Sequence, residues 1–230
     1  MTIRLICLDA DDTLWHNETY FRRTQAEFAA LLAPFADEAE ALARLEATEH
    51  GNLAAYGYGA KGFVLSMVEA ALALGGGALP VETIARLLDL GKAMLAHPVE
   101  TLDGVPEALD RLAALAPLVL VTKGDLHHQE AKLAASGLGE RFAGVEIVSD
   151  KSAATYTRIF ARHGVAAEEA VMAGNSMRSD VLPALEAGAF AAFVPFELAW
   201  AHEHAAAPQN HPRYREVASL AALAEWVAQL

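Results

Sequence analysis

The sequence has one cysteine, Cys7, in a chain of 230 residues. A single cysteine excludes an intramolecular disulfide, and its place inside an apolar run predicts a buried, inert thiol. The fold must therefore be stabilised by its hydrophobic core. Hydrophobic residues make up 54% of the chain, which is enough for a sizeable core and argues against disorder.

Basic residues are also scarce. Seventeen Lys and Arg stand against thirty Asp and Glu, which gives a formal net charge of −13. This excess of acid argues against non-specific binding to nucleic acid or to an anionic membrane surface, so we expect neither as a partner. An anionic substrate would have to be attracted by locally placed positive charge.

Long uninterrupted apolar runs are missing as well. Acidic residues, glycines or prolines break the apolar stretches, among them Glu69, residues 75–77, Pro117 and Pro183. We therefore expect no membrane-spanning segment of about 20 residues. The N-terminal segment carries Arg4 within a strand-like run and does not resemble a secretory signal, so we expect a soluble, cytoplasmic protein.

The sequence does contain a short apolar run that ends in acids. Residues 3–15 read IRLICLDADDTLW, so a predicted buried strand is followed by Asp9, Asp11, Asp12 and Thr13. Three carboxylates this close repel one another unless positive charge lies among them, and Mg²⁺ binds carboxylate and phosphate oxygens. The run therefore predicts a divalent-cation site at the carboxyl edge of a sheet, with an acidic turn as the alternative.

The remainder of the chain divides by its periodicity. Residues 16–100 contain helical patterns at 18–48, interrupted near Pro34, and at 63–74 and 81–97, with no strand-like segment. From residue 101 onward helices and strands alternate. Strands are expected at 118–122, 145–149, 170–174 and 189–195, and helices at 104–115, 125–136, 152–163 and 179–187. An edge strand at 216–220 would precede a final helix at 220–229.

Repeated βα units predict parallel strands with helices on both faces of the sheet. The expected fold class is therefore α/β, with a Rossmann-like three-layer α/β/α core formed by residues 1–15 and 101–230. Residues 16–100 would form an inserted helical domain. In such a sheet the polar residues that follow successive strands meet at one edge. Those residues are Thr122 and Lys123, Lys151, and the segment GNSMRSD at 174–180.

These motifs resemble the haloacid dehalogenase superfamily of phosphohydrolases. DADDT at 9–13 is similar to its DxDxT motif, Thr122 and Lys151 match its second and third motifs, and GNSMRSD is similar to its GDxxxxD motif. The helical insertion resembles the C1 cap of that family. The resemblance spans nearly the whole chain and implies a Mg²⁺-dependent phosphatase acting on a small phosphorylated metabolite.

The resemblance also implies roles for single residues. Asp9 would be the nucleophile that forms an aspartyl-phosphate, and Asp11 the general acid and then base. Thr13 would brace the loop, Thr122 would bind phosphoryl oxygens, and Lys151 would offset the charge on Asp9 and phosphate. Mg²⁺ would be held by Asp9, by the backbone carbonyl of Asp11 and by the fourth motif.

Two positions depart from the family pattern. Asp12 stands where glycine is frequent, at a place that Asp tolerates. Asn175 replaces the first aspartate of GDxxxxD, so one negative charge is lost and metal affinity is expected to be weaker. Whether Asn175 or Asp180 is the direct metal ligand is left open.

Lys61 and Lys123 are further candidates for substrate binding. Lys61 lies in a glycine-rich segment, 57–62, that we expect to be a loop, and Lys123 follows Thr122; an exposed surface position is the alternative for each. Histidines at 127, 128, 202, 204 and 211 lack the spacing and the cysteine partners of a zinc site.

Several functional alternatives stay open. A 2-haloacid dehalogenase uses the same nucleophile but needs no acid two residues later, so Asp11 argues against it. A phosphomutase keeps both acids, and a catalytically quiet regulatory relative is suggested by Asn175 alone. An apolar face of the helical insertion would also allow a homodimer.

Overall fold

The computed structural model describes residues 2–198, 200 and 203–230. The chain forms two compact units. The core unit comprises Met1–Glu18, Val99–Lys123 and Gln129–Leu230, and the helical unit comprises Thr19–Pro98 and Gly124–His128. The boundaries expected from the sequence lie within three residues of these divisions, but residues 124–128, expected in the core, group with the helical unit.

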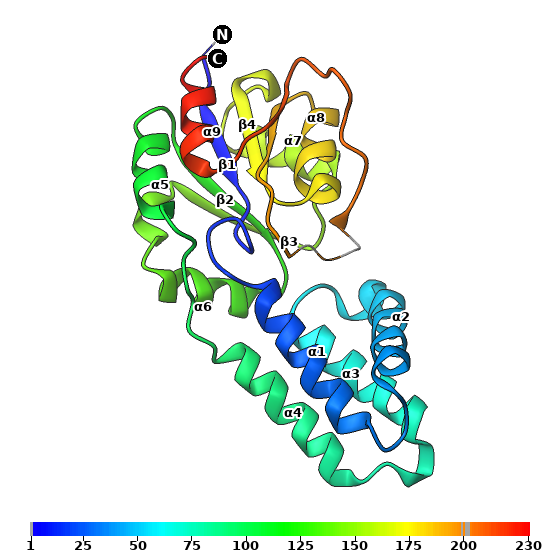
Figure 1. Cartoon of the computed structure of the whole chain (residues 1–230). Coiled ribbons are helices and arrows are strands. Elements are labelled where there is room, and N and C mark those ends of the chain that lie inside the picture. Colours follow the sequence, from blue (N-terminus) through cyan, green and yellow to red (C-terminus); the bar gives the residue numbers. More distant parts are fainter. Residues whose placement is uncertain (1, 199, 201–202) are drawn as a thin grey trace. The chain divides into compact units, whose positions relative to one another are not determined.

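The core unit contains a six-stranded parallel sheet in the order β3-β2-β1-β4-β5-β6 (Figure 1). The strands are β1 (Leu5–Leu8), β2 (Leu118–Lys123), β3 (Gly144–Val148), β4 (Ala170–Gly174), β5 (Phe190–Phe193) and β6 (Tyr214–Glu216). This confirms the predicted α/β class with a parallel sheet. The strand order reverses between β1 and β4, and this switch point is where open α/β sheets bind ligands.

Helices cover both faces of the sheet. They are α5 (Val105–Ala113), α6 (Leu126–Ser136), α7 (Ala153–Arg162), α8 (Leu182–Glu186) and α9 (Leu220–Val227). Short 3₁₀ turns lie at η2 (Gly139–Arg141) and η3 (Ala167–Glu169), and η4 (Met177–Val181) is a single π-helical turn.

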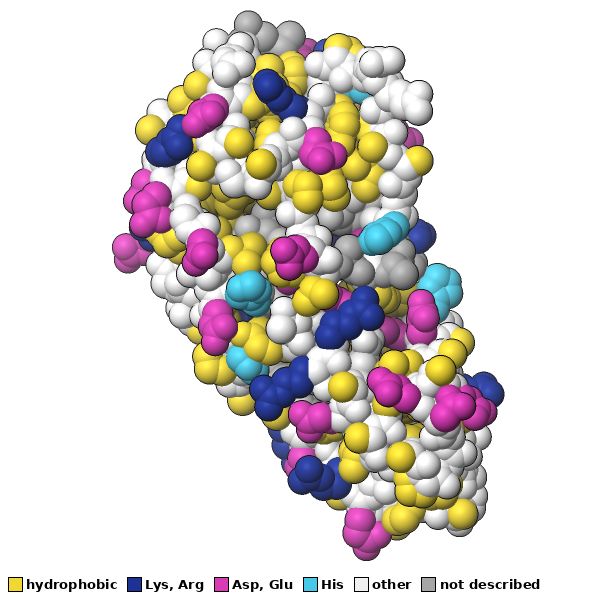
Figure 2. All heavy atoms as spheres, viewed as in Figure 1, with side chains coloured by type: hydrophobic (Ala, Val, Ile, Leu, Met, Phe, Trp, Pro, Cys, Tyr) yellow, Lys and Arg dark blue, Asp and Glu magenta, His cyan; other side chains and the backbone are white. Residues whose placement is uncertain are grey.

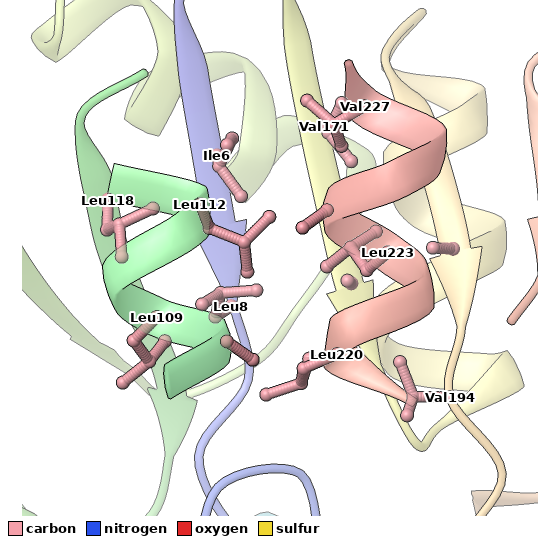
Figure 3. Close-up of a cluster of buried hydrophobic side chains, with 14 of the residues drawn as sticks. Ile6, Leu8, Leu109, Leu112, Leu118, Val171, Val194, Leu220, Leu223 and Val227 are labelled. Carbon is pink, nitrogen blue, oxygen red and sulfur yellow. The ribbon is translucent and has the colours of Figure 1, made fainter. Parts of the chain in front are cut away.

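The side chains of β1 alternate between two cores, as the twofold period of a strand requires. Ile6 and Leu8 join the cluster under α5 and α9, where Leu112 and Leu223 point toward the sheet (Figure 3). Leu5 and Cys7 join the opposite cluster with residues of α7, η4 and α8. Full burial of a Leu or Ile side chain stabilises a fold by about 1.5–3 kcal/mol, so β1 is held firmly from both faces.

The helical unit has a core of its own. It is built from α1 (Glu18–Leu32), whose first residue belongs to the core unit, together with α2 (Glu38–Tyr56), α3 (Ala60–Gly75), η1 (Gly76–Ala78) and α4 (Val81–Leu95). Fully buried residues of this core include Phe28, Phe63, Met67 and Leu87.

One helical stretch of the described chain, Ala60–Ala78, is long and apolar enough to cross a membrane by length and composition alone. Half of that stretch is buried within the molecule, and buried core helices of soluble proteins satisfy the same criterion.

Three details differ from the sequence-based expectation. The edge strand is Tyr214–Glu216 and not 216–220, because the Ser219 side chain accepts a hydrogen bond from the Ala222 N–H and starts α9. The helix expected at 179–187 begins instead with the π turn at 177–181. Lys61 is not in a loop, since α3 already begins at Ala60.

The surface carries both signs of charge despite the acidic total. On the face seen in Figure 2, acidic and basic side chains are interspersed among apolar ones and are not gathered by sign. Local charges near a site will therefore affect ligand binding more than the overall field does.

Candidate active site

The ends of β1 and β4 bring two predicted motifs together. Leu8 pairs with Ala173, and the N–H of Asp9 donates to the Ala173 carbonyl at 2.9 Å. Gly174 follows directly, and a Cβ atom there would lie 2.8 Å from the Cβ of Asp9 and 2.1 Å from Oδ2 of Asp180. Only glycine lets these chain segments approach so closely.

Lys151 lies between two buried carboxylates. Its Nζ contacts Asp9 Oδ1 and lies 2.7 Å from Asp180 Oδ1. Burial raises the pKa of Asp9 against the lowering effect of Lys151, and Asp180 raises it further. Burial alone would lower the pKa of Lys151, but the two carboxylates outweigh burial and raise it. The lysine is therefore held protonated beside Asp9 and Asp180.

Both carboxylate oxygens of Asp180 accept hydrogen bonds. Its Oδ1 accepts from Lys151, and its Oδ2 accepts from the Ser176 N–H at 2.9 Å, while its side chain is fully buried. This arrangement fits a residue that orients Lys151 and the turn after β4.

Asn175 lies against the oxygens of the first motif. Its backbone N–H donates to Thr13 Oγ1 at 3.2 Å, and Thr13 Oγ1 lies 3.3 Å from Asp9 Oδ2. One terminal atom of the Asn175 carboxamide is 3.2 Å from Asp9 Oδ2 and 3.2 Å from the Asp11 carbonyl oxygen. If that atom is nitrogen, it donates to both oxygens. If it is oxygen, three oxygens converge, which is the donor set that Mg²⁺ prefers.

The convergence uses one carboxylate, one amide and one backbone carbonyl. Within the described part of the chain no group of three His, Cys, Asp or Glu side chains is placed to hold a metal ion. With the Asn175 carboxamide oxygen turned toward Asp9, the set would hold a single carboxylate and two amide oxygens, so it is compatible with that finding. His202 lies outside the described residues.

Asp11 is held by three donors. Lys132 Nζ lies 2.5 Å and Trp15 Nε1 2.7 Å from its Oδ1, and Gln129 Nε2 lies 3.1 Å from its Oδ2. Burial would raise the pKa of Asp11, but the Lys132 ammonium and the hydrogen bonds from all three donors lower it below the ordinary value. The side chain of Asp11 is thus fixed in position and ionised.

Thr122 is buried at the end of β2, with 1% of its surface exposed. Its Oγ1 accepts a hydrogen bond from Gln129 Nε2 at 2.6 Å and donates to the Lys123 carbonyl at 3.3 Å. Gln129 therefore contacts both Asp11 and Thr122.

Asp12 has a structural role. Its φ of 61° is in the left-handed region that Asp tolerates, and its carboxylate accepts from the N–H groups of Asn17 at 2.8 Å and Glu18 at 3.0 Å. Burial raises the pKa of Asp12 to about 7, against the effect of these hydrogen bonds. The acid that replaces the frequent glycine thus anchors the start of α1.

Lys123 is engaged by neighbours on its own unit. Its Nζ lies 2.6 Å from Glu203 Oε1 and 2.8 Å from Ser179 Oγ, and Glu203 Oε2 accepts from Ser179 Oγ at 2.5 Å and from Ser176 Oγ. Glu203 links the segment after β5 to the ends of β2 and β4. No sequence signal indicated it, because the segment from 195 to 213 has no periodicity.

Lys61 forms an ion pair with Asp125 at 2.9 Å inside the helical unit, and Asp125 also accepts from the His128 N–H at 3.0 Å. Substrate binding by Lys61 and Lys123 stays a prediction. Gln129 and Lys132 were not anticipated either. The only available signal was their spacing of three on the helix that follows Thr122, which places both on one face.

Comparisons with protein families and with solved structures agree. The family model for haloacid dehalogenase-like hydrolases matches residues 3–188 of this chain. A haloacid dehalogenase-like family hydrolase from Xanthomonas campestris is 40% identical, with a TM-score of 0.89 over 99% of this chain and 91% of that chain. None of the curated protein sequences matches this chain.

Two more distant solved structures are of proteins named for different activities. A predicted phosphoglycolate phosphatase from Haemophilus somnus is 17% identical, with a TM-score of 0.64 over 98% of both chains. An L-2-haloacid dehalogenase from Xanthobacter autotrophicus with chloropropionic acid covalently bound is 16% identical, with a TM-score of 0.66 over 100% of both chains. At these identities the likeness shows the fold alone.

Proposed function

Because this chain belongs to the haloacid dehalogenase-like hydrolases, we propose that it is a Mg²⁺-dependent phosphatase that hydrolyses a small phosphate monoester. The observation that carries the proposal is the convergence of Asp9 Oδ2, the Asp11 carbonyl and the Asn175 carboxamide within 3.2 Å contacts. A cation at this point would lie beside the nucleophile, where a phosphate dianion needs its charge neutralised.

Mg²⁺ would be held by Asp9, the Asp11 carbonyl and Asn175, and it would supply charge neutralisation for a phosphate dianion. Asp180 would act indirectly, because its fully buried carboxylate is already bound to the Lys151 ammonium and the Ser176 N–H. The local arrangement supports a cation, because two carboxyl groups, Asp9 and Asp180, share a single buried lysine.

Asp9 would attack phosphorus with Oδ1, since Oδ2 would be the oxygen that holds Mg²⁺ together with the Asp11 carbonyl and Asn175. A bond forms between Oδ1 and phosphorus, the ester bond breaks, and the leaving oxygen takes a proton from Asp11. Water then attacks the phosphorus of the aspartyl-phosphate and gives a proton to Asp11, which releases phosphate and restores Asp9. Thr122 would bind a phosphoryl oxygen, and Lys151 would offset the accumulated negative charge.

Asp11 must be protonated for the first step, although Lys132 favours its ionised form in the free protein. A phosphate dianion arriving beside Asp11 brings negative charge, which favours the protonated form. The ionised form in turn suits the second step, in which Asp11 accepts a proton from water.

A 2-haloacid dehalogenase or a phosphomutase of the same family is the alternative. Haloacid hydrolysis by Asp9 has no need of a held carboxylate at Asp11, so the three donors around Asp11 favour a reaction with proton transfer. A mutase would return the phosphoryl group to a substrate and release no net phosphate.

The test measures phosphate release from 4-nitrophenyl phosphate with Mg²⁺, with EDTA, and with Asp9→Asn. We expect turnover that EDTA abolishes and that Asp9→Asn reduces by on the order of 10³-fold or more, because the nucleophile is lost. Asp103→Asn, at an exposed position, is the matched control and should leave the rate unchanged. Chloride release from 2-chloropropionate without phosphate release, or turnover that survives Asp9→Asn, would refute the proposal.

A further inference from the structure

We propose that Gln129 and Lys132 of α6 are positioning residues that fix the Asp11 carboxylate for proton transfer, with Oδ2 as the oxygen that exchanges the proton. The inference rests on the proposed phosphatase function and assigns roles to two residues that the four sequence motifs do not include. It is carried by the hydrogen bonds around Asp11 and Thr122.

The two oxygens of Asp11 differ in the number of donors they face. Each carboxylate oxygen has about two lone-pair sites. Oδ1 accepts from Lys132 Nζ at 2.5 Å and from Trp15 Nε1 at 2.7 Å, so both of its sites are used. Among the described residues Oδ2 accepts from Gln129 Nε2 alone, at 3.1 Å, which leaves one site. Oδ1 is therefore the anchored oxygen, and Oδ2 is the one able to carry a proton toward a substrate.

Gln129 contacts both Asp11 Oδ2 and the hydroxyl of Thr122, the group proposed to bind phosphate. The same Nε2 atom lies 3.1 Å from Asp11 Oδ2 and 2.6 Å from Thr122 Oγ1, so the two oxygens are at most the sum of these distances apart. A phosphate monoester bound at Thr122 would thus present its ester oxygen within reach of Asp11. The arrangement matches the alignment that proton transfer to a leaving group requires.

The orientation of the Gln129 carboxamide is determined by its neighbours. Its Nε2 faces three acceptors, the third being the Lys123 carbonyl at 2.8 Å, so a rotated amide would set oxygen against oxygen. Its Oε1 is buried without a hydrogen-bond partner among the described residues, and Gln129 as a whole is 3% exposed. A buried polar atom left unpaired costs about 1–3 kcal/mol, so packing alone is a poor explanation for glutamine here.

Lys132 acts from the next turn of the same helix. Its side chain is 11% exposed, and besides Asp11 it contacts Asn17 Oδ1 at 3.2 Å. A largely buried ammonium with a paired carboxylate contributes both charge and direction. Because Lys132 contacts Oδ1 of the Asp11 carboxylate and Gln129 contacts Oδ2, the two side chains together restrict rotation of that carboxylate.

The test is the dependence of kcat/KM on the pKa of the leaving group, measured with a series from 2,4-dinitrophenyl phosphate to alkyl phosphates. A leaving group that departs as a stable anion needs no proton, whereas an alkoxide does. For Lys132→Met and Gln129→Met we expect a loss of on the order of 10²-fold with alkyl phosphates but only about threefold with 2,4-dinitrophenyl phosphate.

Conservative and distant variants complete the design. Lys132→Arg keeps the charge and a donor and should restore most of the rate with alkyl phosphates, while Glu130→Gln, exposed on the same helix, should leave the whole series unchanged. Circular dichroism and thermal unfolding of each variant confirm that it is folded.

A steeper dependence on leaving-group pKa in both Met variants would support the inference. Equal losses across the series in a folded variant would overturn it, because a general structural role lowers all rates alike. The two hypotheses can be refuted separately. Absence of Asp9-dependent turnover in the parent enzyme overturns the proposed function together with this inference. An active parent whose Met variants lose kcat/KM equally across the leaving-group series overturns the inference alone.

Discussion

At the scale of single residues, Asp9, Asp11 and Asp12 have three different electrostatic environments. Asp9 pairs with Lys151, Asp11 with Lys132, and Asp12 with backbone N–H groups at the start of α1. Burial and charge therefore raise the pKa of two of them and lower that of the third. Differences of this kind let neighbouring carboxyl groups take different roles within one site.

Glu203 provides a residue-scale prediction with a pH dependence. Burial would raise the pKa of Glu203, but Lys123, Ser176 and Ser179 outweigh burial and lower it to about 2, from an ordinary 4.5. A lowered pKa stabilises the folded state above pH 4.5, and the contribution is lost as the pH falls toward 2. We expect Glu203→Gln to reduce the free energy of unfolding by about 2–3 kcal/mol at pH 7 and by about half as much at pH 3, measured by urea denaturation.

The exposed Glu168 offers a matched control for this substitution. Glu168→Gln should change stability little at either pH, because surface charges contribute little. A Glu203→Gln variant whose destabilisation is equal at pH 7 and pH 3 would contradict an ionic role for Glu203.

At the scale of elements, Lys151 lies directly before the start of α7. Ser152 is the N-cap of this helix, and its Oγ accepts from the Thr155 N–H at 3.3 Å. Lys151 directly precedes the cap. Removing the hydroxyl should therefore disturb both the helix and the contact of Lys151 with Asp9.

We predict that Ser152→Ala lowers the free energy of unfolding by about 1 kcal/mol and also lowers kcat. Ser219→Ala is the matched control, since Ser219 caps α9 by accepting from the Ala222 N–H at 3.2 Å and adjoins no site residue. It should cost a similar amount of stability and leave kcat unchanged. Equal effects of both variants on kcat would show that the cap does not position Lys151.

The elements themselves were largely predictable, because hydrophobic period and turn residues are local properties. The strand LVLVT at 118–122 and the helix at 104–115 agree with β2 and α5 within two residues. The position of β6 was wrong because Ser219 belongs to a helix cap, which the sequence does not distinguish from a strand end. Gln129, Lys132 and Glu203 could not be placed at the site, since their partners are 118, 121 and 80 residues away along the chain.

At the scale of the whole molecule, the chain builds separate hydrophobic cores in its two units. The clusters on either face of the sheet involve residues of the core unit, and the third cluster involves residues of the helical unit. The helical unit is inserted between β1 and α5, so unfolding it need not interrupt the sheet. The two cores should therefore respond separately to substitution.

Leu87 and Leu112 allow a matched test of this independence, because both are fully buried leucines in helices, one in each unit. Leu→Ala at a site of this kind costs about 2–5 kcal/mol. We expect Leu87→Ala to reduce amide hydrogen-exchange protection in α3 and α4 while β1 and β4 keep theirs. Leu112→Ala should reduce protection in β1 and β4, since Leu112 packs in the same cluster as Ile6 and Val171. Equal loss of protection in the sheet strands with Leu87→Ala would mean that the two units unfold as one cooperative structure.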